Sequence, residues 1–183
     1  MPIIFNTINT DLFLLRSIVE SDINHVFKGL SNPDVIKYYG VNYKTLEETK
    51  VQMDWFNNLA LQEIGIWLAL CSPDNHIFYG AVGLNNLTTT HQKAELGFWL
   101  LPEFWGKALM AKAIPLICTY AFQNLGLNRI EAFVETENHG SKNLLTKLDF
   151  EHEGTMKNSE IKNNKFISLD IYARFNPQRQ QAI

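Results

Sequence analysis

The segment whose residues are best suited to binding and catalysis joins a carboxylate to a turn that carries a lysine. Glu95 lies on an apolar stretch that runs through Trp99 to Pro102, and Gly106-Lys107-Ala108 then opens a segment with helical periodicity. The pattern predicts a strand, a short turn and a helix N-terminus with free backbone N–H groups. Such N–H groups and the helix dipole bind anions, and a diphosphate fits this description. The alternative is that the small residues only let the helix start pack closely on the strand.

Other common chemistries lack their defining motifs. The sequence contains no H-E-x-x-H, no nucleophile elbow, no P-loop and no G-x-G-x-x-G after a strand. No two of the five histidines have a helical spacing that would hold zinc, so no metal site is predicted. A catalytic triad built from residues distant in sequence would leave no motif of this kind.

Composition indicates one folded domain. The 183 residues are 46% hydrophobic and 19% charged, which is typical of a globular chain, and we expect a single domain over 1–176 with a frayed tail at 177–183. The net charge of −3 argues against a dedicated nucleic-acid binder. Cys71 and Cys118 form no C-x-x-C motif, which favours buried thiols in a reducing compartment.

Targeting and membrane signals are missing from the sequence. The first residues lack a basic region and a long apolar stretch, and no apolar run approaches the roughly eighteen residues of a membrane span. We therefore expect a cytoplasmic protein with no membrane partner.

The elements that position the central junction begin with a short strand and three helices. The strand covers 12–16, and the helices begin at Asp22, at Pro33 and after Thr45. Thr45 and Glu48 form the T-x-x-E pattern of a capping box, and the helix that they open reaches about residue 62.

Strands dominate the rest of the chain. They are predicted over 66–71, 77–84, 93–101, 129–135, 150–159 and 165–175. The strand over 93–101 is apolar on both faces, so we expect it to be central and covered on both sides.

Two helices interrupt these strands, over 106–124 and 140–148. Pro115 predicts a bend within the first of them, and Gly126 is suited to a left-handed helix stop. The element order predicts an α+β fold, with a mixed central β-sheet flanked by helices on both faces.

The chain resembles the GNAT superfamily of acetyl-CoA-dependent N-acetyltransferases, in particular its RimJ/RimL-type branch. The similarity is carried by the order of several short motifs along almost the whole chain. They are Thr10 to Arg16, Asn32-Pro33, Ala94 to Leu100, Trp105-Gly106-Lys107, Leu125 to Ile130, Asn138 with Ser141, and Leu144 to Phe150.

The resemblance implies that acetyl-CoA is the cosubstrate and that no metal is used. Pantetheine would pair with the backbone of the central strand, and the diphosphate would lie on the amides that follow it. The implied cofactor-binding residues are Trp99, Leu100, Leu101, Trp105, Gly106, Lys107, Ala108, Leu109, Met110, Ala111 and Asn138.

Three residues depart from the motifs of this branch. Ala108 stands where the diphosphate loop usually has glycine, Met110 where glycine or alanine is commoner, and Asp149 where a glycine is usual. We expect Ala108 to be tolerated if its φ is negative, and Asp149 to adopt the left-handed conformation at modest cost.

The implied mechanism is direct attack of an amine on the thioester, through a tetrahedral oxyanion. A backbone N–H of Leu100 or Leu101 would polarise the acetyl carbonyl, Glu95 would take the amine proton through water, and Ser141 would protonate the leaving sulfur. The alternatives are a structural hydrogen bond within the sheet for Glu95, and satisfaction of free helix amides for Ser141.

The acceptor favoured by this mechanism is a protein N-terminal α-amine. At pH 7 a lysine-like amine costs about 4.6 kcal/mol to deprotonate and an α-amine only about 1 kcal/mol, so one water-mediated glutamate suits the α-amine. The predicted acceptor pocket contains Tyr38, Tyr39, Trp55 and Phe56, although such aromatics are more often core residues.

Other functions remain open at this level. The acceptor could be a small-molecule amine such as a polyamine, an antibiotic or an amino acid. The chain could instead be a non-catalytic acyl-CoA sensor, or bind another nucleotide at the junction. A homodimer is also open.

Overall fold

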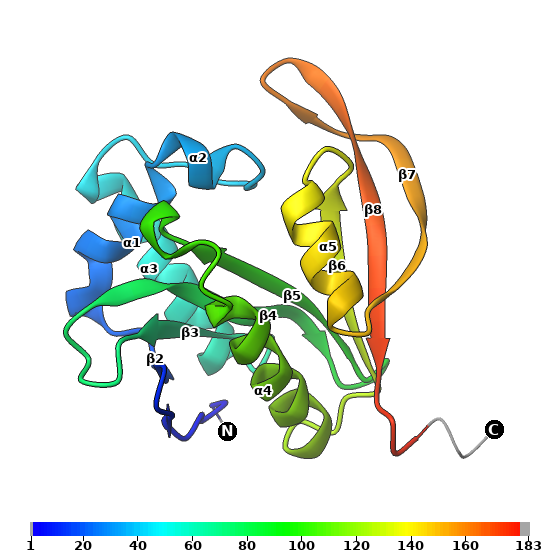
Figure 1. Cartoon of the computed structure of the whole chain (residues 1–183), viewed down its shortest axis with the longest axis horizontal. Helices are drawn as coiled ribbons and strands as arrows, with labels where there is room; N and C mark the ends of the chain where they lie inside the picture. Colours follow the sequence, from blue (N-terminus) through cyan, green and yellow to red (C-terminus); the bar gives the residue numbers. More distant parts are fainter. Residues whose placement is uncertain (1, 180–183) are drawn as a thin grey trace.

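The computed structural model describes residues 2–179 and contains one mixed sheet (Figure 1). Its eight strands lie in the order β1-β2-β3-β4-β5-β6-β8-β7. Their bounds are Ile8–Asn9, Leu14–Ser17, Ile66–Cys71, Phe78–Thr88, Lys93–Leu100, Arg129–Glu135, Glu151–Lys162 and Lys165–Phe175 for β1 to β8. All neighbouring pairs are antiparallel except β5 and β6, which are parallel. The predicted α+β fold with a mixed sheet is confirmed.

The strand predictions are accurate where apolar runs are long. The bounds of β3, β6 and β8 match the predictions, whereas β4 and β7 extend further, to Thr88 and Lys162. The two-residue strand β1 was not predicted, because its partner strand and not its own sequence holds it in the sheet.

Five α-helices and two short 3-10 helices cover the sheet. The α-helices α1 to α5 span Ile23–Leu30, Pro33–Ile36, Leu46–Leu61, Leu109–Gln123 and His139–Lys147, and the 3-10 helices η1 and η2 span Glu20–Asp22 and Pro102–Phe104. The start of α3 differs slightly from a capping box. Thr45 Oγ1 accepts the N–H of Glu48 at 3.1 Å, but the Glu48 carboxylate accepts the N–H of Lys44.

Helices pack on both faces of the sheet and form two apolar cores. One core lies under α4 and α5 and includes Leu15, Leu68, Leu70, Ile114, Ile130 and Leu145. The other lies under α1, α2 and α3 and includes Val26, Leu30, Val35, Phe56, Leu59 and Trp67. Strand β5 contributes Ala94 and Leu96 to the first core and Trp99 to the second, which also contains Leu101 directly after the strand. The prediction that this strand is central and covered on both faces is confirmed.

Helix α4 starts later than predicted and runs unbroken through Pro115. The bend expected there stays a prediction. Gly126 has a φ of +67° as predicted, and the N–H of Leu127 donates to Ala121 O at 3.0 Å, which is the long bond of a helix-ending motif. Asp149, which follows α5, has a φ of +60°, so the left-handed conformation expected there is confirmed.

Strands β7 and β8 form a long hairpin that projects beyond the rest of the sheet (Figure 1). Asn163 and Asn164 have φ values of +51° and +60°, and two such residues are what a tight hairpin turn requires. Lys162 Nζ donates to Lys37 O at 2.6 Å and to the Glu135 carboxylate at 2.5 Å. The hairpin is thereby tied to the segment that follows α2.

The structure describes only the first three residues of the tail that was predicted over 177–183. Residues 177–179 form a turn in which the N–H of Gln178 donates to Asn176 Oδ1 at 3.0 Å. The remainder of that predicted tail, 180–183, lies outside the described residues. Within residues 2–179, no helix is long and apolar enough to cross a membrane.

Candidate active site

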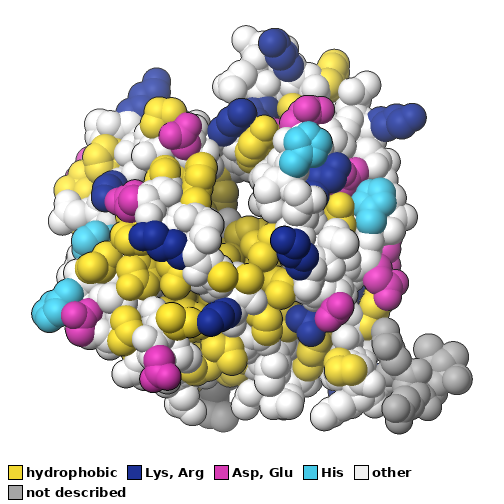
Figure 2. Space-filling model, viewed as in Figure 1, with side chains coloured by type: hydrophobic (Ala, Val, Ile, Leu, Met, Phe, Trp, Pro, Cys, Tyr) yellow, Lys and Arg dark blue, Asp and Glu magenta, His cyan; other side chains and the backbone are white. Residues whose placement is uncertain are grey.

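A cavity of about 1180 Å³ lies between the helical side of the molecule and the side that carries the hairpin. Figure 2 shows a hollow at this position, with hydrophobic side chains at its base. Strand β5 contributes Glu95 to Leu100 to the wall, and the loop after it contributes Phe104 to Ala108. The strand and loop that were singled out from the sequence therefore line one cavity.

The cavity exists because β5 and β6 separate. They pair through only three positions, from Lys93 with Arg129 to Glu95 with Glu131. Beyond Glu95 the two strands diverge (Figure 1), which leaves the edge of β5 that faces β6 without a partner strand. An extended ligand can pair with such an open edge.

The backbone N–H of Leu100, at the end of β5, points into this opening. The N–H of Leu101 donates to Tyr79 O of β4 at 2.9 Å. Because backbone groups alternate between the two edges of a strand, the N–H of Leu100 points to the opposite edge, toward the cavity. The side chain of Leu101 is only 2% exposed and belongs to the second core. The prediction for Leu101 was therefore wrong, because its amide is already paired with β4.

The loop between β5 and α4 contains two residues in the left-handed backbone conformation. Gly106 has a φ of +72° and Ala108 a φ of +56°, so the negative φ on which tolerance of Ala108 was expected to depend is not found. The helix that was predicted from Gly106 begins at Leu109, because these conformations interrupt it. The indole Nε1 of Trp105 donates to Leu100 O at 2.9 Å and fastens the loop to the end of β5.

The N-terminus of α4 has no side-chain cap. Ala108 occupies the cap position and cannot accept a hydrogen bond through its methyl group. The N–H groups of Leu109, Met110 and Ala111 have no partner within the helix, and all three residues line the cavity. Of the three lysines that line the cavity, Lys37, Lys107 and Lys147, Lys107 belongs to the loop that leads into α4. This end of the cavity is suited to an anion.

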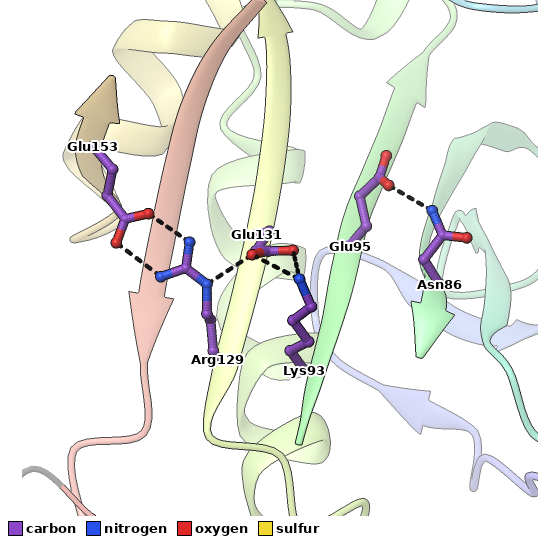
Figure 3. Close-up of polar contacts among 6 residues, drawn as sticks. All are labelled: Asn86, Lys93, Glu95, Arg129, Glu131 and Glu153. Atoms are coloured by element: carbon purple, nitrogen blue, oxygen red, sulfur yellow. Dashed lines mark hydrogen bonds and ion pairs between the residues drawn. The ribbon is translucent and has the colours of Figure 1, made fainter. Parts of the chain in front are cut away.

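Glu95 lies at the branch point between β5 and β6. It is half-buried, and its Oε2 accepts a hydrogen bond from Asn86 Nδ2 at 2.8 Å (Figure 3). The neighbouring carboxylate, Glu131 of β6, is bonded by Lys93 at 3.0 Å and by Arg129 at 2.8 Å. Glu95 itself forms no ion pair among residues 2–179, which leaves its carboxylate available to accept a proton.

A neutral tyrosine lies near this carboxylate. Burial, together with the neighbouring Tyr43 and Glu95, raises the pKa of Tyr39 far above its usual value. The Tyr39 hydroxyl therefore keeps its proton throughout the physiological range.

Ser141 and Asn138 lie at the start of α5, on the β6 side of the cavity. Asn138 Oδ1 accepts the N–H of Ser141 at 3.1 Å and so caps the helix. Ser141 lies one turn inside and lines the cavity, so its hydroxyl is not the group that caps the helix.

The predicted acceptor residues separate into two groups. Tyr38, Tyr39 and Trp55 line the cavity, whereas Phe56 is 6% exposed and packs in the second core. Phe56 was therefore wrongly placed in the pocket, because adjacent residues on a helix point about 100° apart and Trp55 takes the cavity side.

The sequence reasoning missed Trp67 of β3, which lines the cavity although it lies on a wholly buried strand. Gly83 and Gly97 lie opposite each other on β4 and β5, and Trp67 on β3 pairs with Gly83. A glycine within each of the two strands that follow Trp67 was the only hint in the sequence that this side chain needs space beside it. Among the described residues, no group of three or more His, Cys, Asp or Glu side chains could hold a metal ion.

Comparison with known proteins places these features in a family. Residues 13–151 match the family model described as Acetyltransferase (GNAT) domain. The chain is 30% identical over 175 residues to the uncharacterized N-acetyltransferase YoaA of Bacillus subtilis, covering 95% of this chain and 99% of that protein.

Solved structures show the same fold. A ribosomal-protein-S5-alanine acetyltransferase from Vibrio fischeri superposes with a TM-score of 0.84 at 20% identity, over 94% of this chain and 98% of that one. A spermidine N-acetyltransferase from Vibrio cholerae, in complex with CoA and spermine, superposes with a TM-score of 0.80 at 19% identity, over 91% and 96%.

Proposed function

Because the chain belongs to the GNAT family of acetyltransferases, we propose that it transfers the acetyl group of acetyl-CoA to the α-amine of a polypeptide N-terminus. The observation that supports this most directly is the V-shaped opening between β5 and β6. The free N–H of Leu100, the uncapped end of α4 and the carboxylate of Glu95 all border it.

Coenzyme A would bind at the end of the cavity near α4. The N–H groups of Leu109 to Ala111 and the side chain of Lys107 would hold the diphosphate, and the open edge of β5 would pair with pantetheine. The thioester supplies an acetyl carbon that an amine can attack. Asn138 and Ser141 approach from α5 on the opposite side.

Three groups that border the opening would each have a different role in the reaction. The N–H of Leu100 donates to the acetyl carbonyl oxygen and stabilises the negative charge that develops there. Glu95 takes the proton of the attacking amine through a water molecule, and the Ser141 hydroxyl gives a proton to the departing sulfur.

An α-amine suits a site with one proton acceptor. Generating the neutral form at pH 7 costs about 1 kcal/mol for an α-amine and about 4.6 kcal/mol for a lysine-like amine. Acetyltransferases of ribosomal proteins among the structural neighbours are consistent with this choice.

The test is Glu95→Gln, which keeps the shape of the side chain and removes the proton acceptor. We expect kcat to fall by about 10²- to 10⁴-fold at pH 7, with acetyl-CoA affinity and Tm nearly unchanged. The deficit should shrink at pH 9, where more of the amine arrives neutral. The release of the coenzyme A thiol measures kcat at both pH values.

Glu131→Gln is the matched control for this test. This carboxylate lies beside Glu95 on β6 but is bonded to Lys93 and Arg129, so its loss should lower Tm and leave kcat unchanged. Full activity of Glu95→Gln at pH 7 would remove Glu95 from the mechanism.

A further inference from the structure

The half of the cavity next to Glu95 has a floor made by a single indole. Trp67, Gly83 and Gly97 are aligned across β3, β4 and β5. A Cβ added at Gly83 would lie 2.5 Å from Trp67 Cγ, and one added at Gly97 would lie 2.5 Å from Trp67 Cζ2. The ring therefore lies flat over both glycines, and any larger residue at either position would displace it.

The far end of this indole lies over the part of β5 that carries the proposed base. On β5, Glu95 and Trp99 are the nearest residues on the same face as Gly97, so the far end of the Trp67 ring lies between them. Trp55 of α3 leans over the same ring, with centroids 6.0 Å apart and an interplanar angle of 57°. The acceptor amine thus meets Glu95 beside a wall of aromatic carbon.

Few carboxylates line the cavity near this aromatic wall. The carboxylates that line the cavity are Asp34, Glu95 and Glu135, and Glu135 is already bonded to Lys162. Asp34 is exposed at the rim. A polyamine would bring several ammonium groups into a region with one free carboxylate, and an unpaired buried cation is strongly disfavoured.

Two buried donors also lack partners here. The indole Nε1 atoms of Trp67 and Trp99 form no hydrogen bond within residues 2–179, although each side chain belongs to a residue that is only 4% exposed. Both residues line the cavity. Each of these Nε1 atoms has less than 1 Å² of accessible surface, so both lie within the protein interior, and only the carbon faces of the two rings are offered to a ligand.

We propose that the acceptor is a peptide whose first residue has an aromatic or large aliphatic side chain. That side chain lies against the aromatic wall formed by Trp67 and Trp55. This inference rests on the proposed function. In the reaction the amine nitrogen forms a bond to the acetyl carbon, the carbon–sulfur bond breaks, and one amine proton is transferred to the coenzyme A thiolate.

The experiment uses peptides that differ only in their first residue, with Phe, Leu, Gly or Asp there, and spermidine as a further acceptor. Acetyl-CoA binding is measured by calorimetry and transfer by mass spectrometry. We expect kcat/KM for the Phe and Leu peptides to exceed that for the Gly peptide by tenfold or more, with spermidine below all three.

Variants connect this preference to the aromatic wall. Trp67→Leu and Trp55→Ala should each lower the Phe-to-Gly ratio at least fivefold and leave acetyl-CoA affinity unchanged. Leu61→Ala is the matched control, because Leu61 lies on α3 with Trp55, is 53% exposed and does not line the cavity. Since Trp55 is 38% exposed, its variant should fold even if Trp67→Leu does not.

The outcomes separate this inference from the proposed function. If acetyl-CoA binds and the Gly peptide is preferred, the inference is overturned and the proposed function stands. If acetyl-CoA binds but spermidine is preferred or no peptide is acetylated, the proposed peptide acceptor is overturned together with the inference. An unchanged Phe-to-Gly ratio in the Trp55 variant also overturns the inference. If acetyl-CoA does not bind, the proposed function fails and the inference with it.

Discussion

Ala108 carries conformational strain at a position where the fold needs a left-handed turn. Its φ is +56° and its ψ is +13°, and its side chain is exposed and forms no cap. A methyl group in this conformation costs about 1–2 kcal/mol, which glycine does not pay. Ala108→Gly should therefore stabilise the folded protein.

The size of the gain follows from two opposing contributions. Glycine relieves about 1–2 kcal/mol of strain but adds about 0.4–1 kcal/mol of unfolded-state entropy. We expect a net increase of about 0.5–1 kcal/mol in the free energy of unfolding. In a chain of 183 residues this raises Tm by about 1–4 °C.

The assay is urea unfolding followed by circular dichroism, with coenzyme A titrated by calorimetry in parallel. The mirror control is Gly106→Ala, because Gly106 has a φ of +72° and an added Cβ would meet no atom within 4 Å. That variant introduces strain without a clash and should lose about 1 kcal/mol. An Ala108→Gly protein that is less stable than the parent would refute the reasoning, since it would show that Ala108 is not strained.

Three further predictions concern charge and thiol chemistry. Lys107→Glu should weaken coenzyme A binding by about tenfold or more without lowering Tm, because a carboxylate at the loop opposes the diphosphate; unchanged affinity by calorimetry would contradict this. Burial raises the pKa of Asp170, but the hydrogen bonds that its carboxylate accepts, above all from Lys142, lower this pKa by more than burial raises it. The pKa of Asp170 is therefore below its usual value. Its contribution to stability is therefore present above about pH 4 and lost as pH falls below that value; Asp170→Asn should unfold in urea with a weaker acid dependence, and an unchanged dependence would count against the ion pair. Burial raises the pKa of Cys71 and Cys118 to about 11, so neither should react with Ellman's reagent before unfolding, and rapid labelling of the native protein would disprove their burial.

Most elements of this fold could be predicted because their signals are local. Strand β3 is a continuous apolar run and the buried apolar residues of β6 recur at every second position, and the predicted bounds of β3, β6 and β8 match the observed ones. Gly126 and Asp149 adopt the left-handed conformations expected of them, since a helix end is decided by its own few residues.

The position of the candidate site was also visible in the sequence, but its details were not. The run from Glu95 to Ala111 indicated a strand, a turn and a helix start, and these residues do line the cavity, apart from a few around Leu101. Which amide faces the ligand depends on the pairing of β5 with β4, and this register is a contact between distant residues.

Tertiary structure alone decided the shape of the acceptor pocket. Phe56 and Trp55 are adjacent in sequence, yet one enters the core and the other the cavity, because the packing of α3 on the sheet selects its buried face. Trp67 becomes the floor only because Gly83 and Gly97 are brought beside it by two strand pairings. Apolar periodicity determines which segments become strands and helices, whereas registers and crossing angles determine which side chains meet, and these depend on contacts between residues far apart in the chain.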